Sequence, residues 1–333
     1  MTRVYAVVIA VAVIFALSIP CGRAQVRPEI RPIESMTVTT QQFLLGEQNG
    51  KSTLLAGELR IPDGTRDRIP VVILVHGSGG LAEYHERWAQ ELNSIGVAAF
   101  LLDSFSGRGI IETRSNQSQL DNIAMMVDAY RALALLARDP RIDANRIAVM
   151  GFSKGAVASI YSSIERFRKM YAPPNVQFAA HIGLYTPCYE HYREEDIVTG
   201  KPMRLFHGSA DDYVPVAPCR LYVEKLKKKG VDISLTEYAG VYHTYDNFRR
   251  STQPESFQDA QTRRNCDLVE GDHGVLLNSK TGKPFAIDSD PCVERGVHMG
   301  YNEAATAMTV KAVKDFLIAT FKLKPSISQS RSR

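Results

Sequence analysis

From about residue 69 onward, apolar runs alternate with longer amphipathic segments. Ile69–Val75 is a continuous apolar run, which is typical of a strand buried on both faces. The pattern predicts further strands at Val97–Leu102, Ile147–Met150, Gln177–Leu184, Met203–Phe206 and Asp232–Tyr238. The segments between and after them predict helices at Tyr84–Asn93, Leu120–Ala137, Ala156–Arg168, Pro215–Lys229 and Glu303–Phe321. This alternation predicts a single α/β domain with a mainly parallel central sheet flanked by helices.

Two apolar segments precede this alternating region. Met36–Leu45 and Thr53–Ile61 read as strands on either side of Glu47-Gln48-Asn49-Gly50. Because Asn-Gly favours a tight turn, we expect an N-terminal β-hairpin here.

The first 24 residues have the pattern of a secretory signal peptide. Arg3 precedes the uncharged apolar run Val4–Leu17, and Gly22-Arg23-Ala24 has the small residues of a cleavage site. The run is shorter than the about 20 residues of a membrane-spanning helix, which disfavours an uncleaved anchor. We therefore expect cleavage after Ala24, a secreted or periplasmic protein, and no stable membrane anchor afterwards.

The composition is that of an ordinary globular protein. The 333 residues are 44% hydrophobic and 23% charged, which excludes collagen-like, disordered and multi-span membrane chains. The formal charge of +4 is too balanced for a nucleic-acid-binding surface. Removal of residues 1–24 takes away two arginines and no acidic residue, so the remaining 309 residues carry +2.

Cysteine usage fits an oxidising compartment. Cys21 falls within the signal, where Pro20 disfavours a lipidated cysteine, and four cysteines remain. Of the three possible pairings we favour Cys266–Cys292, which would staple one late segment, together with Cys188–Cys219. The cysteines lack the CxxC spacing of a zinc site, and Asp288-Ser-Asp290 offers too few ligands for calcium. We expect no metal.

The strongest chemical signal is Gly151-Phe152-Ser153-Lys154-Gly155. It follows the predicted strand Ile147–Met150 and opens a predicted helix. Glycines permit the sharp turn that would expose Ser153, and the helix N-terminus favours developing negative charge. The context predicts a nucleophilic serine.

A nucleophilic serine requires a base and an acid, in this architecture in the chain order serine, acid, histidine. Asp211 follows the predicted strand Met203–Phe206, and His243 follows Asp232–Tyr238. Because carboxyl ends of parallel strands share one edge, we expect both side chains near Ser153. Asp212 is the alternative acid, and the alternative histidines are His273 and His298.

The backbone N–H groups of Lys154 and Ser78, with Gly79 next, are the predicted oxyanion-hole donors. The glycines of His76-Gly-Ser-Gly-Gly would also suit a phosphate loop, but the Lys-Ser/Thr of a nucleotide-binding motif is missing. Possible substrate contacts are Arg108, Tyr185 and Tyr242. The cations Arg108 and Lys154 favour an anionic substrate, unless they are simply solvated.

Six motifs together resemble the dienelactone hydrolase family of α/β-hydrolases: His76-Gly-Ser-Gly-Gly, Asp103-Ser-Phe-Ser-Gly-Arg-Gly, Asp139-Pro-Arg-Ile-Asp, Gly-Phe-Ser153-Lys-Gly, Gly208-Ser-Ala-Asp211 and Gly240-Val-Tyr-His243. The resemblance runs from about Leu55 to His243 and resumes in the last predicted helix. It implies an α/β-hydrolase fold, a Ser153–Asp211–His243 triad and no cofactor. The founding members use a cysteine nucleophile where this chain has serine, so the resemblance implies ester hydrolysis rather than cleavage of dienelactone.

Residues 244–302 form a stretch of 59 residues with little periodicity. A loop of that length inside a domain is usually functional, and this one starts at the predicted active-site edge. We expect a disulfide-stapled insertion that either walls the substrate pocket or packs beside the sheet. The expected organisation is a signal peptide at 1–24, a hydrolase domain at 25–322 that contains this insertion, and a flexible tail at 323–333.

The sequence thus predicts a secreted or periplasmic serine hydrolase that cleaves small-molecule carboxylic esters through an acyl-enzyme. An acyltransferase or small peptidase would use the same triad. A non-catalytic binding protein is disfavoured, because binding alone does not require all three groups in order.

Overall fold

The chain is organised around one eight-stranded sheet. A computed structural model describes residues 28–62 and 67–323, so the predicted signal peptide and nearly all of the predicted tail lie outside the described residues. The strand order is β1-β2-β4-β3-β5-β6-β8-β9. All neighbouring strands from β4 to β9 run parallel, and β2 is antiparallel to both β1 and β4. The α/β-hydrolase fold with a mainly parallel sheet is therefore confirmed.

The sheet strands are β1 Glu29–Thr37, β2 Lys51–Arg60, β3 Ile69–Val75, β4 Ala98–Asp103, β5 Ile142–Phe152, β6 His181–Leu184, β8 Met203–Gly208 and β9 Ile233–Tyr238. Alternate residues of β3 enter two separate cores: Val71, Ile73 and Val75 on one face, Val72 and Leu74 on the other. Burial on both faces explains why β3 is apolar throughout.

Helices cover both faces of the sheet. On one side, α2 (Glu83–Asn93) and α7 (Glu303–Phe321) pack over the sheet. On the other side lie α3 (Ala124–Ala137), α4 (Lys154–Tyr161), α5 (Glu165–Tyr171) and α6 (Ala217–Lys228). Every helix in the described ranges is too short or too polar to cross a membrane.

The chain has an N-terminal antiparallel strand pair as predicted, but its first strand lies earlier in the sequence than expected and its connection is not a tight turn. β1 and β2 pair antiparallel, from Glu29 opposite Leu59 to Thr37 opposite Lys51. Only Met36 and Thr37 of the expected strand Met36–Leu45 belong to β1, and most of the remainder forms a short helix, α1 (Thr40–Leu44). Thr39 and Gln42 form a capping box at its start, a local signal that the apolar pattern concealed.

Other predicted elements differ from the structure in their bounds, two helices among them. The expected helix Ala156–Arg168 is two helices, α4 and α5, which are separated at residues 162–164. The expected helix Leu120–Ala137 begins only at Ala124, after a 3-10 turn at Gln117–Gln119.

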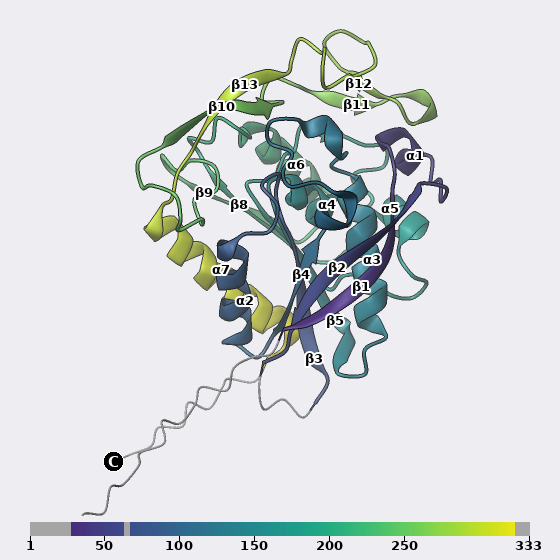
Figure 1. Ribbon diagram of the computed structural model, residues 1–333, viewed down its shortest axis with the longest axis vertical. Helices are drawn as coiled ribbons and strands as arrows, with labels where there is room; N and C mark the ends of the chain where they lie inside the picture. The colour runs from purple at the N-terminus through teal and green to yellow at the C-terminus, as the bar shows by residue number, and fades with distance from the viewer. Residues whose placement is uncertain (1–27, 63–66, 324–333) are drawn as a thin grey trace, which may run out of the picture.

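Residues 244–302 form two small sheets above the carboxyl ends of the main strands (Figure 1). β10 (Glu255–Thr262) pairs with β13 (Glu294–Met299). β11 (Leu268–Glu270) pairs with β12 (Leu276–Asn278) and, on its other side, with β7 (Glu190–His191) of the main domain. The structure contains both disulfides that the sequence analysis favours, Cys188–Cys219 and Cys266–Cys292. Two disulfides fit an oxidising compartment.

Candidate active site

Ser153 occupies the sharp turn between β5 and α4. Its φ of 52° and ψ of −117° are a strained combination for a residue with a side chain. A Cβ on Gly151 would lie 2.1 Å from the carbonyl oxygen of Gly155, and one on Gly155 would lie 2.1 Å from that of Val75. Both glycines are therefore required by close backbone packing, which fixes the turn that presents Ser153 Oγ.

A continuous chain of hydrogen bonds joins Ser153, His243 and Asp211. Ser153 Oγ lies 2.9 Å from His243 Nε2, and His243 Nδ1 lies 2.6 Å from Asp211 Oδ2. The other carboxylate oxygen, Asp211 Oδ1, accepts from the backbone N–H groups of Tyr213 and Val214. The three side chains come from the ends of β5, β8 and β9, the sheet edge at which the sequence analysis expects them.

The Asp211 carboxylate is fully buried and is held ionised by histidines. Burial alone raises the pKa of Asp211, but the charge of His243 and hydrogen bonds from His207 and His243 outweigh burial and lower the pKa to about 2. His207 Nε2 lies 3.4 Å from Asp211 Oδ2, a contact that the sequence analysis missed. The negative charge can orient His243 and stabilise its protonated form.

The alternative acid and one alternative histidine contact each other instead. Asp212 accepts from the backbone N–H and lies 2.8 Å from the Nδ1 of His298, where both side chains are partly exposed. The other alternative, His273, is exposed in a 3-10 turn beyond β11. None of these three residues lines a cavity that contains Ser153.

A cavity of about 170 Å³ opens onto Ser153 and His243. Its lining combines the loop after β3 with residues of the 244–302 segment. The residues that line it include Ser78, Gly79, Arg114, Tyr185, Tyr213 and Arg250. Among residues 28–62 and 67–323, groups of three or more His, Cys, Asp or Glu that could hold a metal are absent.

A second, much smaller cavity of about 20 Å³ lies on another side of Ser153. It has room for about one water molecule. Lys154, Gln117 and Tyr213 line it, together with Gln261 and Arg263 from the 244–302 segment. Residues of this segment thus line both cavities at Ser153.

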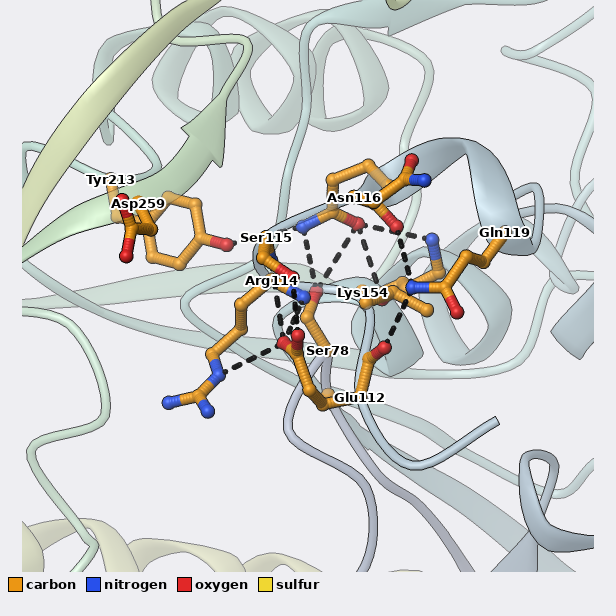
Figure 2. A network of polar contacts seen from close by, with 12 residues as sticks. Ser78, Glu112, Arg114, Ser115, Asn116, Gln119, Lys154, Tyr213 and Asp259 are labelled. Carbon is orange, nitrogen blue, oxygen red and sulfur yellow. Dashed lines mark hydrogen bonds and ion pairs between the residues drawn. The ribbon is translucent and has the colours of Figure 1, made fainter. Parts of the chain in front are cut away.

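Lys154 is buried rather than solvated. Its Nζ donates to Gln117 Oε1 at 3.1 Å, and Figure 2 shows Lys154 close to Ser78 within this polar network. Burial, followed by the charge of Arg263, lowers the pKa of Lys154 to about 7. Gln117 lies in a loop where the sequence offered no chemical signal, and the sequence analysis missed it.

Two of the three predicted substrate contacts, Arg108 and Tyr242, lie outside the lining of the two cavities at Ser153. Arg108 forms a buried ion pair with Asp128 and donates to Thr37 Oγ1, so it ties the loop after β4 to β1. Tyr242 is half-buried, and its ring lies near His298, outside the lining of the two Ser153 cavities. Tyr185, the third, does line the larger cavity.

Arginines that the sequence analysis did not single out line this cavity. Arg114 and Arg250 both lie over the ring of Phe257, at 5.9 and 4.6 Å from its centroid. Burial, followed by the charge of Arg114, lowers the pKa of Arg250. The Nε of Arg250 is buried and has no hydrogen-bond partner among the described residues.

Comparison with known proteins places these observations in context. The model of the dienelactone hydrolase family matches residues 55–321. A search of curated proteins found no match.

Several solved structures share the fold. A dienelactone hydrolase-like promiscuous phosphotriesterase from metagenomic libraries is 16% identical, with 88% of this chain and 98% of that chain covered and a TM-score of 0.57. Esterase 2 of Thermogutta terrifontis, phosphorylated by paraoxon, is 17% identical, with 90% and 96% covered and a TM-score of 0.54. A dienelactone hydrolase described as putative, from Klebsiella pneumoniae, is 13% identical, with 89% and 100% covered and a TM-score of 0.53.

Proposed function

The chain belongs to the dienelactone hydrolase family, and from this premise we propose that it is a serine hydrolase that cleaves carboxylic esters of small molecules through an acyl-enzyme. The observation that carries the proposal is the hydrogen-bonded chain from Ser153 Oγ through His243 to Asp211, with distances of 2.9 and 2.6 Å. The strained turn at Ser153, which opens onto the cavity of about 170 Å³, supports a nucleophilic role.

In the proposed reaction, Ser153 Oγ attacks the ester carbonyl while His243 Nε2 takes the hydroxyl proton. The carbonyl π electrons move to the oxygen, which the N–H groups of Lys154 and Ser78 stabilise. His243 then gives its proton to the leaving alkoxide as the carbon–oxygen bond breaks. Water repeats the sequence on the acyl-enzyme, with His243 again acting as base and then as acid.

Asp211 orients His243 and balances the charge that His243 acquires. Its carboxylate remains ionised because its pKa lies near 2. The Ser153 of this chain stands where founding family members have cysteine, so ester substrates other than dienelactone are proposed.

The proposed setting is the periplasm or the extracellular space. The two disulfides support an oxidising compartment, and residues 1–24 have the pattern of a cleavable signal. Residues 25–322 would then form the hydrolase domain, with 244–302 as an insertion that walls the substrate cavity. The lining of both Ser153 cavities by residues of 244–302 supports the wall.

A fluorophosphonate probe tests the proposal, because it labels activated serines. We expect covalent labelling of the wild type at Ser153 and hydrolysis of short 4-nitrophenyl esters. Ser153→Ala should lose both, whereas Ser289→Ala, at an exposed serine, should keep both. An unlabelled, inactive wild-type protein would overturn the proposal. Adding competing alcohols or peptide amides to the assay distinguishes hydrolysis from acyl transfer and from peptidase activity.

A further inference from the structure

Gln117 links loops that come from separate parts of the chain. It lies in the 3-10 turn Gln117–Gln119, and its side chain is buried. Its Oε1 accepts from Lys154 Nζ at 3.1 Å, and its Nε2 donates to Ser78 Oγ at 3.0 Å and to the hydroxyl of Tyr213 at 3.1 Å. Ser78, Lys154 and Tyr213 are labelled in Figure 2.

The chemistry of an amide suits this position. One end of the Gln117 side chain accepts a hydrogen bond from a buried amine, and the other end donates to two hydroxyl groups. A carboxylate could accept from the amine but could not donate, and an apolar side chain of equal length could do neither. Since unpaired polar groups are costly when buried, these contacts hold the side chains of Ser78 and Lys154 in place.

Ser78 and Lys154 are also the residues whose backbone N–H groups are proposed to bind the oxyanion. Ser78 follows β3 and Lys154 opens α4, so Gln117 spans the gap between the two donors. The loop that carries Gln117 also holds the backbone of Ser78, because the backbone N–H of Thr113 donates to the carbonyl oxygen of Ser78 at 2.8 Å. Oxyanion donors stabilise the transition state because they are fixed in place before the reaction. A group that holds both donors should therefore affect the energy of the transition state more than that of the bound substrate.

The 244–302 segment holds Gln117 in turn. The backbone N–H of Gln117 donates to Gln261 Oε1 at 2.9 Å, and Gln261 Nε2 donates to the carbonyl oxygen of Ile287. Gln261 is buried, and its own backbone N–H donates to the carbonyl oxygen of Arg114. Hydrogen bonds thus run from the small sheets, through Gln117, to both proposed oxyanion donors.

We propose that Gln117 is a positioning residue that sets the spacing of the Ser78 and Lys154 amides, and that Gln261 couples this spacing to the 244–302 segment. This inference rests on the proposed function. It makes the segment a support of the oxyanion hole as well as a wall of the cavity.

The test compares Gln117→Met with Gln119→Met. Both remove an amide from the same turn, but Gln119 is exposed and its Nε2 donates only to nearby backbone carbonyls. With a 4-nitrophenyl ester, we expect Gln117→Met to lower kcat about tenfold to hundredfold, below the loss of a whole oxyanion donor. KM should stay within about twofold, because the contact matters in the transition state. Gln119→Met should match the wild type.

A second readout separates positioning from general destabilisation. A trifluoromethyl ketone forms a tetrahedral oxyanion on the serine, so its inhibition constant should rise in parallel with the fall in kcat. A variant that is merely less stable keeps its affinity in the folded fraction. If Gln117→Met does not fold, Gln117→Glu and Gln261→Met provide the same comparison with smaller losses.

Two outcomes overturn different claims. Wild-type protein that fluorophosphonate does not label at Ser153 refutes the proposed function. Labelled wild type with unchanged kcat and ketone affinity in Gln117→Met, or in both substitute variants, refutes the positioning role alone.

Discussion

Tyr185 packs its ring against His243, with 4.6 Å between the ring centroids. Its hydroxyl donates to Asp246 Oδ1, and Trp88 donates to the other oxygen of the same carboxylate. Burial raises the pKa of Asp246, although the hydrogen bonds from Trp88 and Tyr185 oppose this. Asp246, a buried acid that forms no ion pair within the described part of the chain, therefore fixes the aromatic ring that packs against His243.

Tyr185→Phe should destabilise the protein by about 1–3 kcal/mol, since it removes a donor from a buried carboxylate. Denaturation by urea at pH 7 measures this. The loss of stability caused by Tyr185→Phe should be smaller at pH 4, because protonation of Asp246 removes the negative charge from which the substitution takes a hydrogen-bond donor. Tyr242→Phe, at a half-buried ring, is the control, and equal losses in both variants at both pH values would contradict the role given to Asp246.

Asp211→Asn should leave the fold intact and lower kcat by a factor on the order of 10⁴, as when the acid of a serine-protease triad becomes an amide. The amide donates toward His243 Nδ1 and so favours the wrong tautomer. Steady-state kinetics measure the loss, and Asp212→Asn, which affects the partly exposed contacts with His298 and Arg264, should retain nearly full activity. A similar loss in both variants would argue that the acid has been misassigned.

Lys154→Met should change how stability depends on pH. The folded protein loses the Lys154 proton near pH 7, whereas the unfolded chain keeps it until about pH 10.5. Between these values the unfolded state binds more protons, so wild-type stability rises with pH relative to the variant, by at most about 1.4 kcal/mol per pH unit. The advantage of Lys154→Met should therefore be largest below pH 7 and shrink toward pH 10. Urea titrations at pH 6.5 and 9 that give the same difference would show that the amine is not perturbed.

Arg250→Gln should affect esters according to charge. Arg114 and Arg250 both line the cavity, where Glu112 and Glu255 pair with them. The buried Nε of Arg250 still has no hydrogen-bond partner among the described residues, so a negatively charged acyl group could accept from it. We expect kcat/KM for a hemisuccinate ester to fall about tenfold, a cost near 1.4 kcal/mol, and that for a neutral ester of equal size to stay within about twofold. The exposed Arg249→Gln is the matched control. Equal effects on charged and neutral esters would exclude recognition of the anion.

Removal of the Cys266–Cys292 disulfide tests the wall. The bridge closes a loop with a sequence separation of 26, so Cys266→Ser/Cys292→Ser should lose roughly 3 kcal/mol of stability. Because Gln261 and Arg263 precede Cys266 and line the small cavity, relative kcat/KM values across a panel of acyl sizes should also shift. Unchanged kinetics on every ester, together with the expected loss of stability, would show that the 244–302 segment does not shape the substrate cavity.

The strand–helix alternation could be predicted because buried parallel strands are apolar on both faces, as β3 is. The candidate nucleophile, acid and base could be selected because each directly follows a strand. The burial of Lys154 and Arg108 could not be predicted in this way, because the sequence does not show which group pairs with a given cation. Lys154 pairs with Gln117, in a loop without periodicity, and Arg108 pairs with Asp128, 20 residues further along the chain. β10 and β13 of the 244–302 segment escaped notice because their pairing, with Glu255 opposite Met299, is not local.

The pairing of β7 with β11 has a consequence for protein engineering. Residues 244–302 share a sheet with Glu190–His191, and Arg263 forms a buried ion pair with Glu190. Arg166 on α5 reaches the same sheet through Glu270. A graft of 244–302 onto a related hydrolase would carry only one partner of each of these contacts. A transferable unit must therefore also include residues 188–196, which contain β7, together with the Cys188–Cys219 disulfide that anchors them.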